Sequence, residues 1–255
     1  MIARPLPTRD LVAPLGLIFT DGLDGRTILD GLSVRAWPEG RAERTVAATI
    51  NGAGIAGFLR LPGVRFNPAN PFAGSTQTFI VEVRDAMGRF QTGRVSAEAP
   101  VAGVKRVVMR SAPTRTVAPG RLAFRAELWD AINARAAAFA ILTVKLAGNG
   151  STVVATGMAD AAGRVLAVGD WPTPKLAGAG DKPLWNASRP VTLEILYEPT
   201  APSVPRLDRV ATTPARAWKT RGPDVLFAPA DLADRQPVVF LSTGDTLSRL
   251  LITSP

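Results

Sequence analysis

"TFIVEVRDAMGRF" (residues 78–90) decides the fold class, because it joins a strict alternation to a tight-turn signature. Phe79, Val81 and Val83 fall on one side of an extended chain, and Glu82 falls on the other. A period of two is typical of a β-strand with one buried face. We therefore expect the phenylalanine and valines to face a core and Glu82 to face solvent, with a hairpin turn at 85–89.

A second, almost identical turn lies in "MADAAGRVLAVGDWP" (158–172). In both turns an aspartate is expected to accept hydrogen bonds from nearby backbone N–H groups, and a glycine to take a positive φ. Two copies are compatible with a duplicated site or with a recurring turn. The first is expected after the last strand of its module and the second before the third strand of its own. This mismatch favours structural turns.

The composition also indicates an all-β protein. Of 255 residues, 46% are hydrophobic, 23 are glycine and 22 are proline. Glycine and proline interrupt helices, so many short strands are favoured, and the length allows two modules of about 100 residues each. No run of 18 apolar residues suggests a membrane span.

The rhythm of strands and turns predicts two β-sandwich modules, at residues 10–100 and 105–200. A Pro-rich extension follows at 201–255, ending in strand-like "PVVFLSTGDTLSRLLITSP" (237–255). "TGDT" predicts the turn of a terminal β-hairpin. A lone hairpin is marginal in water, so it must be covered, either by one of the two sandwiches or by a neighbour's sheet.

The absence of histidine and cysteine limits the possible chemistry. Ser-His-Asp and Cys-His catalysis and the usual catalytic zinc sites need those side chains. Carboxylate-pair, lysine or Ser-Lys chemistry and carboxylate-bound hard metals remain. We expect no enzyme activity, no catalytic residue, no cofactor and no metal.

The acidic residues and a glycine-rich stretch offer only weak sites. Asp21, Asp24 and Asp30 have oxygen ligands, but their spacing does not match a calcium loop, so turns are favoured. Residues 51–57, "NGAGIAG", lack the lysine of a phosphate-binding loop. Glu82 and Glu194 are expected in different modules, both facing solvent.

The five tryptophans are the candidates for a sugar-binding platform. Their scatter along the chain favours core and edge packing over a sugar site. They are Trp37, Trp129, Trp171, Trp185 and Trp218.

The net charge of +9 is concentrated in residues 101–126, which contain no acidic residue. The segment is either a set of solvated strand faces or a docking surface for an acidic protein partner. Nucleic acid is a less favoured partner, because a stacking site needs several aromatic residues among the basic ones, and the segment has only Phe124. The predicted interface residues are Lys105, Arg106, Arg110, Arg115 and Arg121, together with Leu250, Leu251 and Ile252 of the C-terminal strand.

Each module resembles the carboxypeptidase regulatory-like family, which has a transthyretin-like sandwich. The resemblance rests on "FTDGLDGRTILDGLSVRA" and "GFLRLPG" in the first module. In the second it rests on "LWDAINARAAAFAILTVKL" and "ATGMADAAGRVLAV". These motifs imply a fold and carry no catalytic residue.

Residues 15–175 also resemble uncharacterised proteins encoded with phage-tail-like contractile injection systems. The segments concerned are "FLRLPGVR", "FIVEVRDAMGRF", "APTRTVAPGRLAFRAELWD" and "GMADAAGRVLAVGDWPTP". This resemblance implies a structural or accessory part of such a particle: baseplate, sheath-associated or cap.

Two functions are therefore carried forward. The first is a structural subunit of a contractile particle, acting through protein contacts and assembled in the cytoplasm, since "LVAPLGLIF" (11–19) makes no convincing signal peptide. The second is a carbohydrate- or protein-binding β-sandwich outside any particle. A carboxylate-based hydrolase is the least favoured function.

Overall fold

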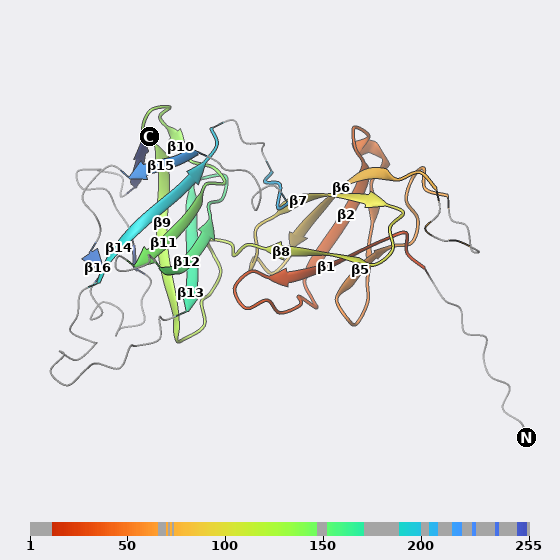
Figure 1. Cartoon of the computed structure of the whole chain (residues 1–255), viewed down its shortest axis with the longest axis horizontal. Coiled ribbons are helices and arrows are strands. Elements are labelled where there is room, and N and C mark those ends of the chain that lie inside the picture. Colours follow the sequence, from red (N-terminus) through yellow and green to blue (C-terminus); the bar gives the residue numbers. More distant parts are fainter. Residues whose placement is uncertain are drawn as a thin grey trace, which may run out of the picture.

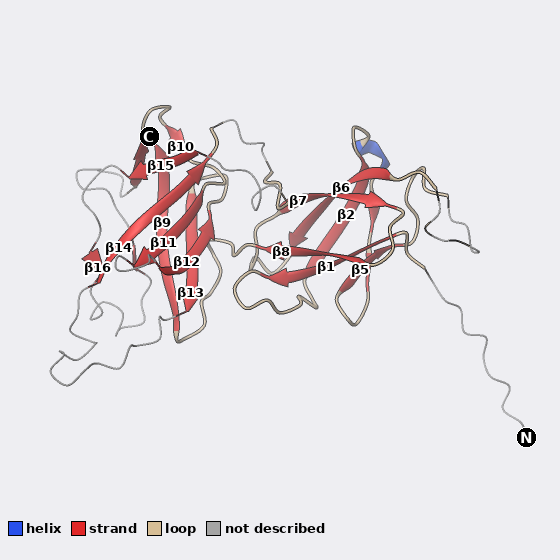
Figure 2. Ribbon diagram, in the orientation of Figure 1, coloured by secondary structure: helices blue, strands red, loops and turns tan. Residues whose placement is uncertain are grey.

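The prediction of an all-β chain is confirmed by the computed structural model (Figures 1 and 2). The structure describes residues 12–65, 70, 72, 74–146, 152–170, 189–199, 204–208, 216–220, 226–227, 238–239 and 249–253. Within these residues the one helical element is a short 3-10 turn, η1 (Ala42–Arg44). No helix in that part of the chain has the length and hydrophobicity to cross a membrane.

The first module is a sandwich of two four-stranded sheets. One sheet has the order β4-β5-β1-β8, and the other has the order β3-β2-β6-β7. The strands are β1 (Leu15–Asp21), β2 (Leu32–Pro38), β3 (Val46–Ala47), β4 (Thr49–Ile50), β5 (Ile55–Phe58), β6 (Gln77–Asp85), β7 (Gly93–Ala99) and β8 (Val104–Met109).

The core of the first module follows the predicted alternation. Phe79, Val81 and Val83 of β6 are fully buried between the sheets, with Phe19 of β1 and Phe58 of β5 in the same cluster. Burial of large apolar side chains contributes about 1.5–3 kcal/mol each. The interior of this sandwich is therefore its main source of stability.

Strand β8 pairs with β1 in parallel, from Gly16 opposite Val104 to Asp21 opposite Met109. The predicted module ranges placed residues 105–109 in the second module, but their strand completes a sheet of the first. The turn at 85–89 joins β6 to β7, and β7 and β8 follow it. The expectation that this turn comes after the last strand of its module is therefore wrong.

The second module is built from one strand path that closes on itself. Its order is β10-β9-β13-β12-β11-β14-β15-β18, and β18 also pairs with β9. Closure leaves fewer free sheet edges than an open sheet has. The strands are β9 (Arg121–Asp130), β10 (Arg135–Ala136), β11 (Ile141–Leu146), β12 (Thr152–Met158), β13 (Arg164–Asp170), β14 (Arg189–Tyr197), β15 (Arg216–Thr220), β16 (Leu226–Phe227), β17 (Val238–Val239) and β18 (Leu250–Thr253).

The two described strands of residues 237–255, β17 and β18, both join β9. Val238 and Val239 of β17 lie opposite Phe124 and Arg125, and β18 pairs in parallel with residues 128–130. The predicted terminal hairpin is wrong for these strands, because each pairs with β9. Of the two ways to cover this segment, the structure shows packing against the chain's own second module.

The two modules lie side by side along the long axis of the molecule, joined by the chain between β8 and β9 (Figure 1). A second connection returns from the second module. Residues 204–208, which we call the strap, follow β14 and bridge in parallel to β7, with Arg206 opposite Arg94. The modules are therefore tied by two separate passages of the chain.

Candidate functional site

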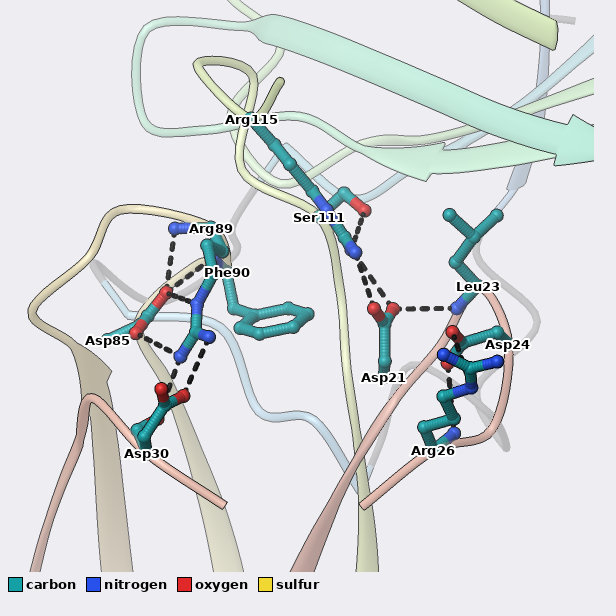
Figure 3. A network of polar contacts seen from close by, with 10 residues as sticks. All are labelled: Asp21, Leu23, Asp24, Arg26, Asp30, Asp85, Arg89, Phe90, Ser111 and Arg115. Carbon is teal, nitrogen blue, oxygen red and sulfur yellow. Dashed lines mark hydrogen bonds and ion pairs between the residues drawn. The ribbon is translucent and has the colours of Figure 1, made fainter. Parts of the chain in front are cut away.

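The candidate site is the junction between the modules, where ionic networks and apolar contacts meet (Figure 3). Asp21, at the end of β1, faces Arg115 of the connecting chain. Arg115 Nη1 donates to Asp21 Oδ1 at 3.0 Å and to Ser111 Oγ at 2.9 Å, and Nη2 donates to Asp21 Oδ2. The backbone N–H of Leu23 also donates to Asp21, at 2.9 Å. Two donors from the guanidinium make this a bidentate pair.

The pKa of the Asp21 carboxyl reflects this environment. Burial raises it, but the hydrogen bonds from Arg115 and the N–H of Leu23 outweigh burial and hold the pKa below its usual value. Asp21 is therefore a charged structural anchor at neutral pH.

A second network lies at the first Asp-x-x-Gly-Arg turn. Asp85 Oδ2 accepts from the backbone N–H of Arg89 at 2.7 Å, and Gly88 has φ +67°. The predicted turn is confirmed. Arg89 also donates from Nη1 to Asp30 Oδ1 at 2.8 Å and from Nη2 to Asp85 Oδ1 at 3.1 Å. Burial raises the pKa of Asp85, yet the bonds from Arg89 bring it below the usual value, while the bond to Asp85 raises the pKa of Arg89.

The Phe90 ring links the two networks. The Arg115 guanidinium lies 4.9 Å from the ring centroid, and that of Arg89 lies 5.4 Å away. Cation–π contacts of this length contribute about 0.5–1 kcal/mol each at partly exposed sites. Phe90 thus stabilises both arginines in the positions that their carboxylates require.

The second module reaches the junction through the chain's second Asp-x-x-Gly-Arg turn, residues 160–164. Asp160 Oδ1 accepts from the backbone N–H of Arg164 at 3.0 Å, which confirms this turn as well. Just before it, Met158 is 1% exposed and belongs to the first module's core, and its carbonyl accepts from Gln91 Nε2. A cavity of about 320 Å³ between the modules is lined by Gln91, Asp160 and Arg164 among others. Both turns are therefore structural turns closed by the same aspartate-to-backbone hydrogen bond, and both lie at the junction.

Apolar contacts and the basic chain segment complete the connection. Leu23 and Val117 pack against a small cluster that includes Leu166 of β13. Arg125 of β9 donates to the carbonyls of Pro113 and Arg115. Each of these contacts joins the connecting chain or the first module to the second.

The strap is bound to β7 by backbone and side-chain bonds. Arg94 N donates to the Pro205 carbonyl at 2.8 Å, and Leu207 N donates to the Arg94 carbonyl at 2.7 Å. Leu207 is 9% exposed and packs in the first module's core. Asp208 Oδ2 accepts from the N–H of Ser96 at 3.0 Å, and although burial raises the pKa of Asp208, that bond helps to lower it overall.

The outer face of β2, β6 and β7 holds a buried carboxylate that the sequence placed in solvent. Glu82 is 3% exposed because Arg35, Arg84 and Arg94 cover it, with closest distances of 3.0, 2.8 and 2.9 Å. Burial raises the pKa of Glu82, but the three guanidinium groups hold it below its usual value. The alternation correctly placed Glu82 on the sheet face opposite the core. It did not predict that arginines on this face would bury the carboxylate.

The basic segment is used differently along its length. Arg115 is paired with Asp21, and Arg121 is paired with Asp170. Arg110 is partly buried, which lowers its pKa. Lys105 and Arg106 of β8 are exposed, and Lys105 Nζ donates to the Ser96 carbonyl. The segment is therefore in large part a junction element, and its role in docking an acidic partner stays a prediction for the exposed β8 residues.

The predicted C-terminal interface residues do not share one environment. Leu250 and Ile252 are buried in the second module's core, so they are not available to a partner, and Leu251 is half-buried. The apolar run at 250–252 correctly indicated a strand that must be covered. Pairing with β9, about 120 residues earlier, could not be read from it.

The other candidate groups are dispersed. Asp21 and Asp30 pair with different arginines, and Asp24 accepts from Arg26 N. Within the described part of the chain no group of acidic residues has a metal-binding arrangement. Residues 51–54 form the turn between β4 and β5, and residues 55–57 belong to β5. Asn51 Oδ1 accepts from the N–H groups of Ala53 and Ile55.

Glu194 and the tryptophans are also far apart. Glu194 pairs with Lys145 on the second module, away from Glu82. Trp37 lies beneath Arg94 in the first module, and Trp129 lies beneath Arg249 in the second. Trp171 and Trp185 fall outside the described residues, and Trp218 is in β15.

Comparison with known proteins gives distant likenesses. No protein-family model matches the chain, so neither family resemblance gains support. A UPF0215 protein of Aeropyrum pernix is 31% identical over 99 residues, which is 39% of this chain and 49% of the relative. The chain thus spans about half of that relative's length.

Two solved structures are similar at about 10% identity. A streptococcal ancillary pilin is aligned over 94% of this chain and 62% of its own, with a TM-score of 0.25. The shaft pilin SpaA of Lactobacillus rhamnosus GG is aligned over 94% and 98%, with a TM-score of 0.26. These likenesses are too distant to transfer a function to this chain.

Proposed function

We propose that the chain is a structural subunit whose two modules act as one rigid spacer and which works through contacts with other proteins. The observation that carries this proposal is the interlocked junction. Met158 and Leu207, from the second hairpin and the strap, both pack in the first module's core. Removing either from that core would expose apolar surface, so bending at the junction is costly.

The state of the carboxylates supports a non-enzymatic role. A general acid or base works best when its pKa lies near the working pH. Asp21, Glu82 and Asp85 have lowered pKa values instead, and each is bonded to at least one arginine. These groups stabilise the fold as anions at neutral pH.

The assembly that we propose is a contractile, phage-tail-like particle, and this finer assignment rests on the sequence resemblance. The alternative of a sugar-binding platform gains no observation in its favour, since Trp37 and Trp129 lie in different modules.

The direct test is to tag the chain at its natural expression level and sediment a gentle lysate. The proposal expects the chain in a high-mass fraction together with sheath and tube subunits. Recovery of the chain only as a free monomer would contradict the structural role. Recovery in an assembly without sheath or tube would overturn the particle assignment alone.

A further inference from the structure

Strand β8 has an unusual place among the long strands. Every other described strand of six or more residues pairs with at least two strands or, for β7, with β6 and the strap. Strand β8 pairs only with β1 in the described part of the chain. An unpaired strand edge is a template for pairing with another chain.

The direction of the backbone groups identifies the residues on the open edge. The Met109 carbonyl accepts from Gly22 N, next to β1, whereas the Arg110 carbonyl accepts from Gln91 N on the other side. Successive carbonyls of an extended chain point to opposite edges. The backbone groups of Arg106 and Val108 therefore point away from β1, toward the open edge.

The open edge of β8 borders a groove between the edge strands β7 and β8 of the two sheets. A cavity of about 490 Å³ lies between β7 and β8. Its lining combines apolar residues such as Leu15 and Val101 with the charged Glu98, Lys105 and Asp208. Small side chains of an added strand would fit against the apolar part of this lining. The strap already pairs with the neighbouring part of the β7 edge. An extended segment can therefore lie at this side of the sandwich.

The side chains of β8 define the chemistry of the partner. Val104 and Val108 are 47% and 44% exposed, and Arg106 is exposed between them. No described residue forms an ion pair with Arg106. A strand with an apolar, acidic, apolar order on that face would match these three positions, and each cross-strand pair contributes about 0.2–1 kcal/mol.

We infer that the open edge of β8 binds an extended segment of a partner protein with an acidic residue opposite Arg106 and apolar residues opposite Val104 and Val108. This inference rests on the proposed function, for which it names the mode of contact. The partner adds a strand beside β8 and places its alternate side chains in the groove.

The test uses the full chain and a synthetic acidic peptide, acetyl-SVAEAVS-amide. The control peptide, acetyl-SVAKAVS-amide, has lysine in place of the glutamate. Binding is followed by fluorescence anisotropy of labelled peptide, and the edge is followed by amide hydrogen exchange. We expect the acidic peptide to slow exchange at Arg106 and Val108 about tenfold or more, while Val107, which faces β1, changes little.

Charge reversal sharpens the test. Arg106→Glu should weaken binding of the acidic peptide about tenfold and favour the lysine peptide, whereas Arg60→Glu, an exposed charge away from β8, should change neither. Absence of binding, equal binding by R106E, or slowed exchange away from β8 would overturn the inference.

The outcomes separate this inference from the proposed function. If the chain sediments with other subunits but fails these peptide tests, the inference about the β8 edge is wrong and the proposed structural role stands. If the chain binds the peptide as expected but enters no assembly, the β8 edge is a binding site and the proposed structural role is wrong.

Discussion

Leu207 of the strap lies directly on Gly93 of β7. A Cβ atom at Gly93 would come within 2.5 Å of Leu207 Cγ, closer than real carbon atoms approach. The glycine thus leaves the space that the strap needs. The contact between the strap and the first module therefore requires a glycine at position 93.

We predict that Gly93→Ala displaces Leu207 and lowers the free energy of unfolding by about 1–3 kcal/mol, the usual cost of overpacking. Urea denaturation measures the loss, and hydrogen exchange at Leu207 N should accelerate. Gly52→Ala is the matched control, because nothing lies within 4 Å of its added Cβ. Equal stability of G93A and G52A would show that the strap does not depend on this contact.

Removal of the Arg115 guanidinium should weaken the junction. Arg115→Ala leaves the largely buried Asp21 carboxylate without its charged partner, and we expect a loss of about 2 kcal/mol in the free energy of unfolding. Arg26→Ala is the control, since Arg26 is 86% exposed and its pair with Asp24 is at the surface. A loss in R115A no greater than that in R26A would contradict the importance of the pair.

Glu82→Gln should destabilise the first module, because three guanidinium groups would then surround a neutral side chain. We expect a loss of about 1–3 kcal/mol, measured by thermal and urea unfolding. Glu98→Gln, on the exposed edge of the same sheet, should cost much less. If both variants lose the same stability, the arginine cluster is only a surface feature.

The stability should fall in acid and be nearly constant around neutrality. Asp21, Glu82, Asp85 and Asp208 have lower pKa values in the folded chain than their ordinary values. Their contribution is therefore present above about pH 4 and is lost as the pH falls through the folded-state values.

Urea unfolding across the pH range measures this dependence. Between about pH 5 and pH 8 we expect little change, because the chain has no histidine. A free energy of unfolding that stays constant or rises below about pH 4 would contradict the assigned pKa directions.

The sequence was sufficient where the cause is local. The alternation in β6 predicted the buried Phe79, Val81 and Val83, and the spacing of Asp85 and Gly88 predicted a turn. These features depend on residues within one strand or one turn, so a short window contains all the information.

Features that depend on distant partners could not be predicted in this way. Glu82 is buried because Arg35 and Arg94 lie opposite it on the two neighbouring strands. Arg115 appeared to be a free basic residue because its partner, Asp21, is 94 positions away. The C-terminal strands looked like a hairpin because their pairing with β9 leaves no local signal.

The most direct test of the central claim, a rigid connection between the modules, is a distance distribution between two spin labels. The chain has no cysteine, so Ala47→Cys and Val153→Cys, both exposed and in different modules, give two unique labelling sites. Pulsed electron paramagnetic resonance should give one narrow distance peak, which broadens in Arg115→Ala and Gly93→Ala. A broad distribution in the otherwise unchanged chain, like that of modules on a flexible linker, would contradict the rigid spacer.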